Sequence, residues 1–121
     1  MAAAEWTIDS HQTETGERPA VTFLGSLEGR DRTEAAALLN MLKDQGNALR
    51  RPNSASLDEG LFELRGKQVR IFYIFLPGRV ALLLDGEIKK RNDIPPATLR
   101  RMRKLQKEAL RRYAERHRPR R

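Results

Sequence analysis

Two turn dipeptides divide residues 61–90 into three short strands, and this pattern restricts the possible folds more than any other feature of the chain. The first strand, Leu61–Arg65, alternates and is followed by Gly66-Lys67, which is typical of a two-residue hairpin turn. Residues 68–76 are rich in β-branched and aromatic side chains, Pro77-Gly78 is a second turn, and residues 79–90 supply the third strand. The pattern therefore predicts an antiparallel meander.

Helical patterns precede the meander. Pro19 fits the first position of a helix whose apolar positions continue to Leu27. A second helix is expected to start at Asp31, with Glu34 three residues later as in a capping box, and to end at Gly46. Two helices are therefore expected on the N-terminal side of the meander.

The remaining segments complete the order of elements. Residues 5–9 alternate and predict a first strand, whereas residues 49–60 predict a loop. Pro95 and Pro96 open a final helix, which Pro119 ends. The order β-α-α-β-β-β-α predicts an α+β fold, in which an antiparallel sheet of about four strands is packed by two N-terminal helices and a basic C-terminal helix.

Basic residues are concentrated in that final helix. Residues 95–121 hold eleven Lys or Arg and two Glu, whereas the rest of the chain holds thirteen basic and fourteen acidic residues. A net charge of +8 that comes from one end is typical of a polyanion-binding segment, and the alternative is a solvated helix face with a disordered tail at Arg120 and Arg121. The side chains expected to contact nucleic acid are Arg100, Arg101, Lys104, Lys107, Arg111 and Arg112.

Length and composition exclude several classes of protein. The 121 residues fit one domain, residues 1–121, in which residues 106–121 form a basic helical extension. Without cysteine there is no disulfide, zinc-thiolate site or thiol nucleophile. His11 and His117 lie near opposite ends of the chain, so we expect no metal site within one protomer and no cofactor.

No segment of the sequence has the pattern of a signal peptide or of a membrane span. The N-terminal MAAAEWTIDSHQ lacks the basic and apolar segments of a signal peptide. The longest apolar runs, residues 71–76 and 80–84, are far shorter than the roughly 20 residues that span a bilayer. We therefore expect a soluble, cytoplasmic protein without membrane association.

Charged residues gather on one face of the expected meander. If each turn dipeptide is a two-residue loop, Glu63 lies opposite Arg70, and Arg70 lies opposite Asp85. That face collects Glu63, Arg65, Arg70, Asp85, Glu87 and Lys89. The opposite face is apolar and is expected to form the core, with Phe62, Leu64, Val69, Ile71, Tyr73, Phe75 and Leu82.

An arginine between two carboxylates has two interpretations. Arg70 belongs either to an ion-pair network on a solvated sheet face or to a site that binds phosphate and moves a proton. Arginine suits the second role because its planar fork binds phosphate oxygens in pairs and keeps its charge. Lys89 and Lys90, just beyond the third strand, either reach the same place or are two solvated lysines at a strand end.

The stretch LFELRGKQVRIFYIFLPGRVALLLDGEIKK, Leu61–Lys90, resembles the HigB-like, phage-derived branch of the RelE/ParE toxins. That branch shows a Leu-(Trp/Phe)-Glu-Leu-Arg strand, a strand with Arg and an aromatic, and an aliphatic strand that ends in paired lysines. The upstream RPAVTFLGSLEGRDRTEAAALL resembles the family's helical hairpin, so the resemblance covers residues 6–105. It implies a RelE-like fold and a toxin, neutralised by a cognate helix-turn-helix antitoxin, that cleaves messenger RNA on the ribosome.

The resemblance also implies a site. Its residues would be Arg65, Arg70 and Lys89 or Lys90, with Glu63 orienting them. The RNA's own 2′-hydroxyl would attack, and the protein would align it, accept its proton and stabilise the crowded phosphate without a metal or cofactor. Tyr73 matches a family aromatic, although the expected register points it into the core.

Three positions depart from the resembled branch. Asp85 stands where its members have His, Glu87 replaces an aromatic, and Asp93-Ile94 replaces Lys-Thr. Asp85 and Glu87 add negative charge beside the implied phosphate site, where Asp85 is a candidate base. Two alternatives stay open, namely a ParE-like gyrase inhibitor with structural arginines, and a non-catalytic nucleic-acid-binding phage-derived protein that works through its basic helix.

Overall fold

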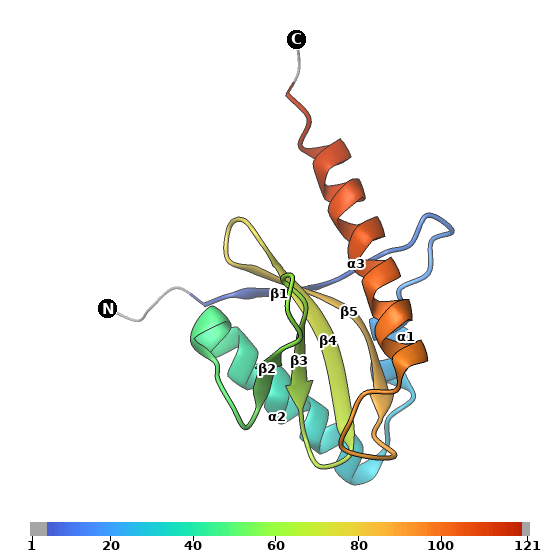
Figure 1. Ribbon diagram of the computed structural model, residues 1–121. Coiled ribbons are helices and arrows are strands. Elements are labelled where there is room, and N and C mark those ends of the chain that lie inside the picture. The colour runs from blue at the N-terminus through green and yellow to red at the C-terminus, as the bar shows by residue number, and fades with distance from the viewer. Residues whose placement is uncertain (1–4, 120–121) are drawn as a thin grey trace.

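The computed structural model describes residues 5–119 and shows, within that range, three α-helices and a five-stranded sheet (Figure 1). In chain order the elements are β1 Thr7–Ser10, α1 Pro19–Gly25, α2 Gly29–Gln45, the 3-10 helix η1 Gly46–Ala48, β2 Ser54–Ser56, β3 Phe62–Arg65, β4 Val69–Leu76, β5 Val80–Ile88 and α3 Pro96–Arg116. This arrangement confirms the predicted α+β fold. The disorder expected at Arg120 and Arg121 concerns residues outside the described range.

The strands lie in the order β1-β5-β4-β3-β2, with β1 parallel to β5 and the other neighbours antiparallel. The meander β3-β4-β5 is as predicted. The sheet has one strand more than expected because β2 lies inside the segment 49–60, which we predicted to be a loop. Ser54–Ser56 has no apolar alternation, and its pairing with β3 makes it a strand.

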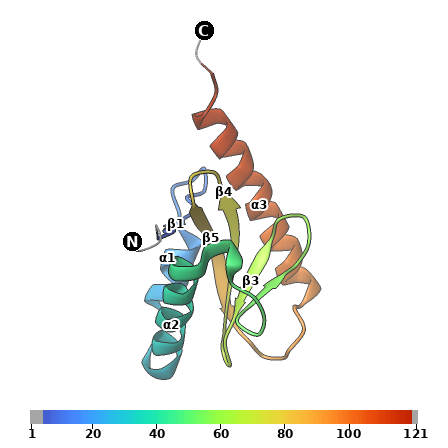
Figure 2. The ribbon, with the colours of Figure 1, turned by 90° about the vertical axis from the view of Figure 1, so that its left-hand side faces the viewer.

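Helices cover both faces of the sheet (Figures 1 and 2). On one face, α1 and α2 pack against Ile71 and Tyr73 of β4. On the other face, α3 packs against Phe72 and Ile74 of the same strand. Alternate side chains of the central strand therefore enter two separate apolar clusters, and the charged sheet face is a covered surface rather than a solvated one.

The first turn differs from the predicted register by two residues. Arg65 lies opposite Arg70, and the N–H of Gly66 donates to the carbonyl of Val69 at 2.9 Å, so the loop is Lys67-Gln68 rather than Gly66-Lys67. Because residues two apart share a face, this even shift leaves Glu63 and Arg70 on the same side of the sheet, as predicted.

The second turn has three residues, Pro77 to Arg79, and Arg79 has a positive φ of 59°. This shift by one residue places Leu82 in the cluster under α3, so its predicted position on the Tyr73 face is wrong. A bulge between Phe72 and Tyr73 then adds one residue to β5 and restores the original side. As a result Arg70 lies opposite Glu87, not opposite Asp85.

Polar contacts hold α3 at its position on the sheet. The amide of Gln106 donates to the carbonyl of Glu59 at 2.7 Å, and Arg103 donates to the carbonyl of Asp58 at 2.9 Å. Further along, His11 Nε2 lies 2.6 Å from Glu108 Oε1.

Among residues 5–119 no helix has both the length and the apolar composition required to cross a bilayer.

Candidate nucleic-acid interface

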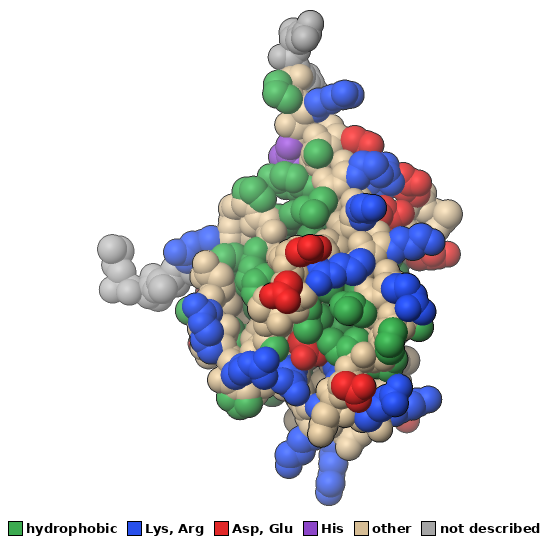
Figure 3. Space-filling view, in the orientation of Figure 1, with side chains coloured by type: hydrophobic (Ala, Val, Ile, Leu, Met, Phe, Trp, Pro, Cys, Tyr) green, Lys and Arg blue, Asp and Glu red, His purple; other side chains and the backbone are tan. Residues whose placement is uncertain are grey.

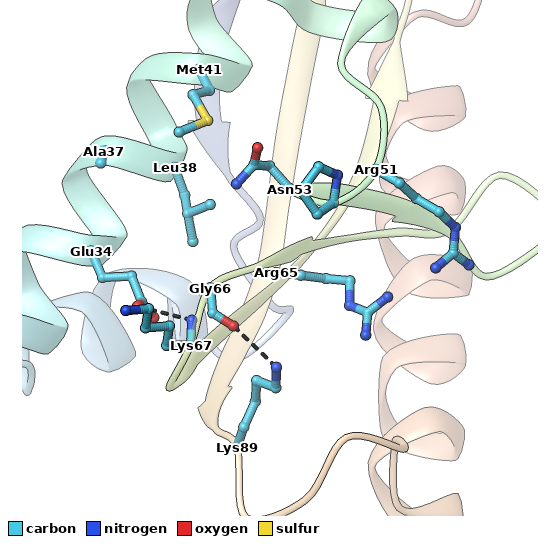
Figure 4. Close-up of a pocket in the computed structure, with 11 residues that line it drawn as sticks. Glu34, Ala37, Leu38, Met41, Arg51, Asn53, Arg65, Gly66, Lys67 and Lys89 are labelled. Carbon is cyan, nitrogen blue, oxygen red and sulfur yellow. Dashed lines mark hydrogen bonds between the residues drawn. The ribbon is translucent and has the colours of Figure 1, made fainter.

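A cavity of about 520 Å³ lies at the end of the sheet where α2, the segment before β2 and the β3–β4 turn meet (Figure 4). Two of the predicted site residues, Arg65 and Lys89, line it. The full set of lining residues is Glu34, Ala37, Leu38, Met41, Arg51, Pro52, Asn53, Arg65, Gly66, Lys67 and Lys89. The lining thus contains four cations and a single carboxylate, which favours an anionic ligand.

The cations come from three different segments. Arg65 is at the end of β3, where its Nε lies 3.3 Å from Glu63 Oε1 and its side chain is 26% exposed. Lys89 follows β5, and its Nζ donates to the carbonyl of Gly66 at 3.0 Å. Arg51 makes no side-chain ion pair or hydrogen bond with any residue that the structure describes. Figure 4 shows the guanidinium groups of Arg51 and Arg65 extending on the same side.

Glu34 of α2 shapes the floor of this cavity. Its carboxylate accepts the backbone N–H groups of Lys67, Gln68 and Val69 at 2.9, 2.9 and 2.7 Å. Glu34 is therefore a cap for the β3–β4 turn, and the capping box predicted for it in α2 is wrong, because that helix begins at Gly29 without a side-chain cap.

The same contacts determine the charge of Glu34. Burial tends to raise its pKa, but the backbone N–H groups of Gln68, Val69 and Lys67, with the charge of Lys89, outweigh that effect and hold the pKa below its ordinary value. Glu34 is therefore an anion whose oxygens are already occupied. It neutralises part of the cationic lining and is a poor proton acceptor.

Arg70, the centre of the predicted site, is buried. It is 1% exposed, and its guanidinium donates to Glu87 at 2.6 Å and to the carbonyl of Asn92 at 2.9 Å. A further contact reaches the carbonyl of Arg91 at 3.3 Å, and Nε lies 3.0 Å from Glu63 Oε2 as an ion pair without hydrogen-bond alignment. Protein atoms therefore take up most of the donors that a phosphate would need.

Glu63 lies between the two arginines and is 4% exposed. Burial raises its pKa, although Arg70, Arg65, Lys89 and Arg51 oppose the change. Because one oxygen faces Arg65 and the other faces Arg70, Glu63 fixes both side chains and is directed away from a ligand. This placement matches the orienting role predicted for it, while the role itself stays a prediction.

The predicted catalytic residues thus do not form one cluster. Arg65 and Lys89 line the first cavity, whereas Arg70 and Lys90 line a second one of about 400 Å³. Asp85 lies in neither: its side chain is 12% exposed, and its carboxylate accepts the N–H of Gly86 at 2.7 Å and pairs with Arg101. The three-residue second turn and the bulge in β5 are the physical reason, since each shifts the register by one residue and together they move Asp85 away from Arg70.

The aromatic residue implied by the resemblance is in the core. Tyr73 is 1% exposed, and its hydroxyl lies 2.6 Å from that of Ser54. Burial raises the pKa of the Tyr73 phenol, opposed by the Ser54 hydrogen bond. The hydrogen bond between the Tyr73 and Ser54 hydroxyls therefore links β4 to β2, on the other side of β3.

The six basic side chains predicted on α3 have different environments. Arg101 pairs with Asp85, Arg111 pairs with Glu14 and Glu115, and Arg112 is half-buried. The other three are exposed and have no ion pair or hydrogen bond within the described range: Arg100, Lys104 and Lys107. Their spacing of four and three residues places them along one stripe of the helix, and Figure 3 shows basic side chains following α3.

Three of the lining residues that were not predicted carry polar side chains from outside the strands and helices. Arg51, Asn53 and Lys67 belong to a loop and a turn whose position relative to Arg65 depends on the fold. The N–H of Arg65 donates to the carbonyl of Asn53 at 2.8 Å, which brings the loop to the strand end. The only sequence signal was the Arg50-Arg51 pair beside Pro52.

No group of three or more His, Asp or Glu side chains within residues 5–119 is placed to hold a metal ion.

A comparison with protein families finds that a family model described as "Phage derived protein Gp49-like (DUF891)" matches residues 22–107. This range is more than half of the chain and includes every residue that lines the first cavity. No curated protein matches the chain.

Proposed function

Because the chain belongs to the family of phage-derived Gp49-like proteins, within the RelE/ParE toxin-like superfamily, we propose that it is the toxin of a toxin–antitoxin pair and acts on RNA. The observation that carries this proposal is the cavity in which Arg51, Arg65 and Lys89 surround a space of about 520 Å³. Two guanidinium forks and an ammonium group suit a phosphodiester, because they combine paired hydrogen bonds with positive charge.

The proposed reaction is a metal-independent cleavage of messenger RNA. The 2′-hydroxyl oxygen attacks the adjacent phosphorus, the bond to the 5′ oxygen breaks, and the products are a 2′,3′-cyclic phosphate and a 5′-hydroxyl. Arg51, Arg65 and Lys89 stabilise the negative charge of the crowded phosphorus, and Glu63 positions Arg65. Glu34 is a poor proton acceptor and Glu63 does not line the cavity, so water takes the proton of the attacking hydroxyl and water protonates the leaving 5′ oxygen.

A second cationic surface supports an RNA bound to a larger particle. The stripe Arg100, Lys104 and Lys107 adds unpaired positive charge on α3. In the proposal these side chains contact phosphates of ribosome-bound messenger RNA or of ribosomal RNA. A cognate antitoxin, a helix-turn-helix protein, neutralises the toxin in the cytoplasm. No cofactor takes part.

Expression and cleavage assays test the proposal. Induced expression is expected to arrest growth, and co-expression of the antitoxin encoded by the neighbouring gene is expected to restore it. Purified protein is expected to cleave messenger RNA in the presence of ribosomes, and Lys89→Ala is expected to lower the rate about 100- to 1000-fold. Lys90→Ala, which removes the next lysine without changing the lining of the first cavity, is the matched control. Normal growth with abundant folded protein would contradict the toxin assignment.

One observation favours a second candidate, a ParE-like inhibitor of DNA gyrase. Arg70 is held in buried ion pairs, and Glu34, the carboxylate that lines the cavity, accepts three backbone N–H groups and has a lowered pKa, so it is a poor base. A gyrase inhibitor needs no such base. A supercoiling assay with the same preparation distinguishes the two, since inhibition of gyrase without RNA cleavage would replace the first candidate.

A further inference from the structure

We propose that the same cavity holds one unpaired nucleobase of the RNA and that Asn53 selects which base is accepted. This inference rests on the proposed function, because it assumes that the cations of the cavity bind an RNA phosphate. It adds a specificity-determining residue and a second binding surface.

The cavity has an apolar side that a phosphate would not use. Three residues of α2 and a proline form it: Ala37, Leu38, Met41 and Pro52. Figure 4 shows Met41 and Leu38 on the side of the cavity away from the guanidinium groups of Arg51 and Arg65. A flat aromatic base can pack on such a wall through dispersion contacts while the attached phosphate reaches the cations.

The volume agrees with a nucleotide. Small-molecule sites typically enclose about 300–1,000 Å³, mostly apolar with a few placed polar groups. The cavity, at about 520 Å³, lies in the lower half of that range. A simple anion would fill only the cationic side, so the combination of an apolar wall and a cationic rim points to a base linked to a phosphate.

Asn53 is the polar side chain placed between these two surfaces. Its backbone is fixed, because its carbonyl accepts the N–H of Arg65 at 2.8 Å and the next residue, Ser54, pairs with Leu64. The side-chain amide is half-buried and forms no hydrogen bond with any residue in the described part of the chain. In Figure 4 it points toward the Met41 and Leu38 side of the cavity. A ligand placed there would satisfy both its donor and its acceptor.

The chemistry of a primary amide determines the selection. Its carbonyl oxygen and its NH₂ group form two hydrogen bonds with a base edge that presents one donor beside one acceptor. The Watson–Crick edge is free only in an unpaired base, so the ligand is single-stranded RNA. Asn53→Asp replaces the donor with a second acceptor. The variant is expected to shift the preference toward guanine, whose Watson–Crick edge presents two adjacent donors.

The test is a titration of the purified full-length protein with the 3′-monophosphates of adenosine, guanosine, cytidine and uridine, and with inorganic phosphate. Because a good bidentate contact is worth about 1–3 kcal/mol, the preferred nucleotide is expected to bind about 5- to 150-fold more tightly than inorganic phosphate. Asn53→Ala should bring the four nucleotides to similar affinities. Asn53→Asp should raise the guanosine-to-adenosine affinity ratio about tenfold or more.

Two controls separate base binding from charge and from folding. Asn40→Asp adds the same charge at an exposed position of α2 that does not line the cavity, and it should leave the nucleotide ranking unchanged. Met41→Ala should weaken all four nucleotides but not inorganic phosphate. Circular dichroism of each variant checks that it folds. The Asn53 variants are expected to fold, because the hydrogen bond between Asn53 and Arg65 uses only backbone atoms.

The outcomes distinguish this inference from the function on which it rests. Nucleotides that bind no better than inorganic phosphate, or an unchanged ranking in both Asn53 variants, would overturn the base site while leaving the phosphate site intact. If neither phosphate nor any nucleotide bound, or if Arg65→Ala left their binding unchanged, the proposed function and the base site would both be overturned.

Discussion

Replacement of Arg70 by Ala should destabilise the folded state rather than only remove an activity. The guanidinium is 1% exposed and faces Glu63, which is 4% exposed, and Glu87. Removal of one partner from a buried ion pair costs about 3–5 kcal/mol, because the remaining charge stays buried without compensation. Domains of this size are stable by about 5–15 kcal/mol, so the loss is a large share of the total.

Urea unfolding measures this loss directly. The ring centroid of the single tryptophan, Trp6, lies 5.1 Å from that of Phe75, so the fluorescence of Trp6 reports the unfolding. We expect Arg70→Ala to lower the free energy of unfolding by about 3–5 kcal/mol. Arg65→Ala is the matched control: it loses a contact with the same Glu63, but its side chain is 26% exposed, so we expect about 1 kcal/mol or less.

A compensating variant tests the cause. If the unpaired charges are responsible, Arg70→Met combined with Glu63→Gln and Glu87→Gln should recover most of the lost stability, since neutral groups of similar size replace the whole network. Arg70→Ala that stays within about 1 kcal/mol of the wild type while losing RNA binding would refute the reasoning and make Arg70 a ligand-binding residue.

Three further predictions concern the turn and the basic helix. Glu34→Gln should cost about 1.5–3 kcal/mol at neutral pH, because it removes a charged acceptor from three N–H groups. Since the pKa of Glu34 is lowered in the folded state, the stability difference measured by urea unfolding should be full above the ordinary glutamate pKa and vanish as the pH falls through the lowered one. Gly66→Ala should destabilise the same turn, because its Cβ would lie 2.2 Å from Glu34 Oε1, and an unchanged melting temperature would contradict this. Arg100→Ala should leave the melting temperature unchanged and lower the log–log salt slope of RNA binding by about 0.7–0.9, whereas Arg101→Ala, which breaks the pair with Asp85, should lower stability.

The fold was predictable because its signals are local. Alternation and turn dipeptides identify the meander, and a helical pattern with a basic face identifies α3. What local patterns could not provide was the pairing of short segments. Ser54–Ser56 becomes a strand only through β3, and β1 pairs with β5 although about seventy residues separate them. Such contacts depend on tertiary packing.

The candidate site was predicted only in part for the same reason. Face assignments for Glu63, Arg65 and Arg70 are correct because the first turn shifts the register by an even number of residues. Asp85 is displaced from Arg70 by the third residue of the second turn and by a bulge, neither of which a residue pattern indicated. Arg51 and Asn53 come from a loop, which the hydrogen bond between Asn53 and Arg65 and the pairing of β2 with β3 bring to the cavity.

The central claim is that the cavity beside Arg51, Arg65 and Lys89 is the RNA phosphate site. The most direct test is the affinity of an RNA oligonucleotide, with 2′-O-methyl ribose at every position to block cleavage, for Arg51→Ala and for its neighbour Arg50→Ala. Arg51 lines the cavity without a partner in the described range, whereas Arg50 donates to the carbonyl of Asn47 outside it. The account predicts weaker binding and a salt slope lower by about 0.7–0.9 for Arg51→Ala alone. Equal effects of the two substitutions, or none from Arg51→Ala, would contradict it.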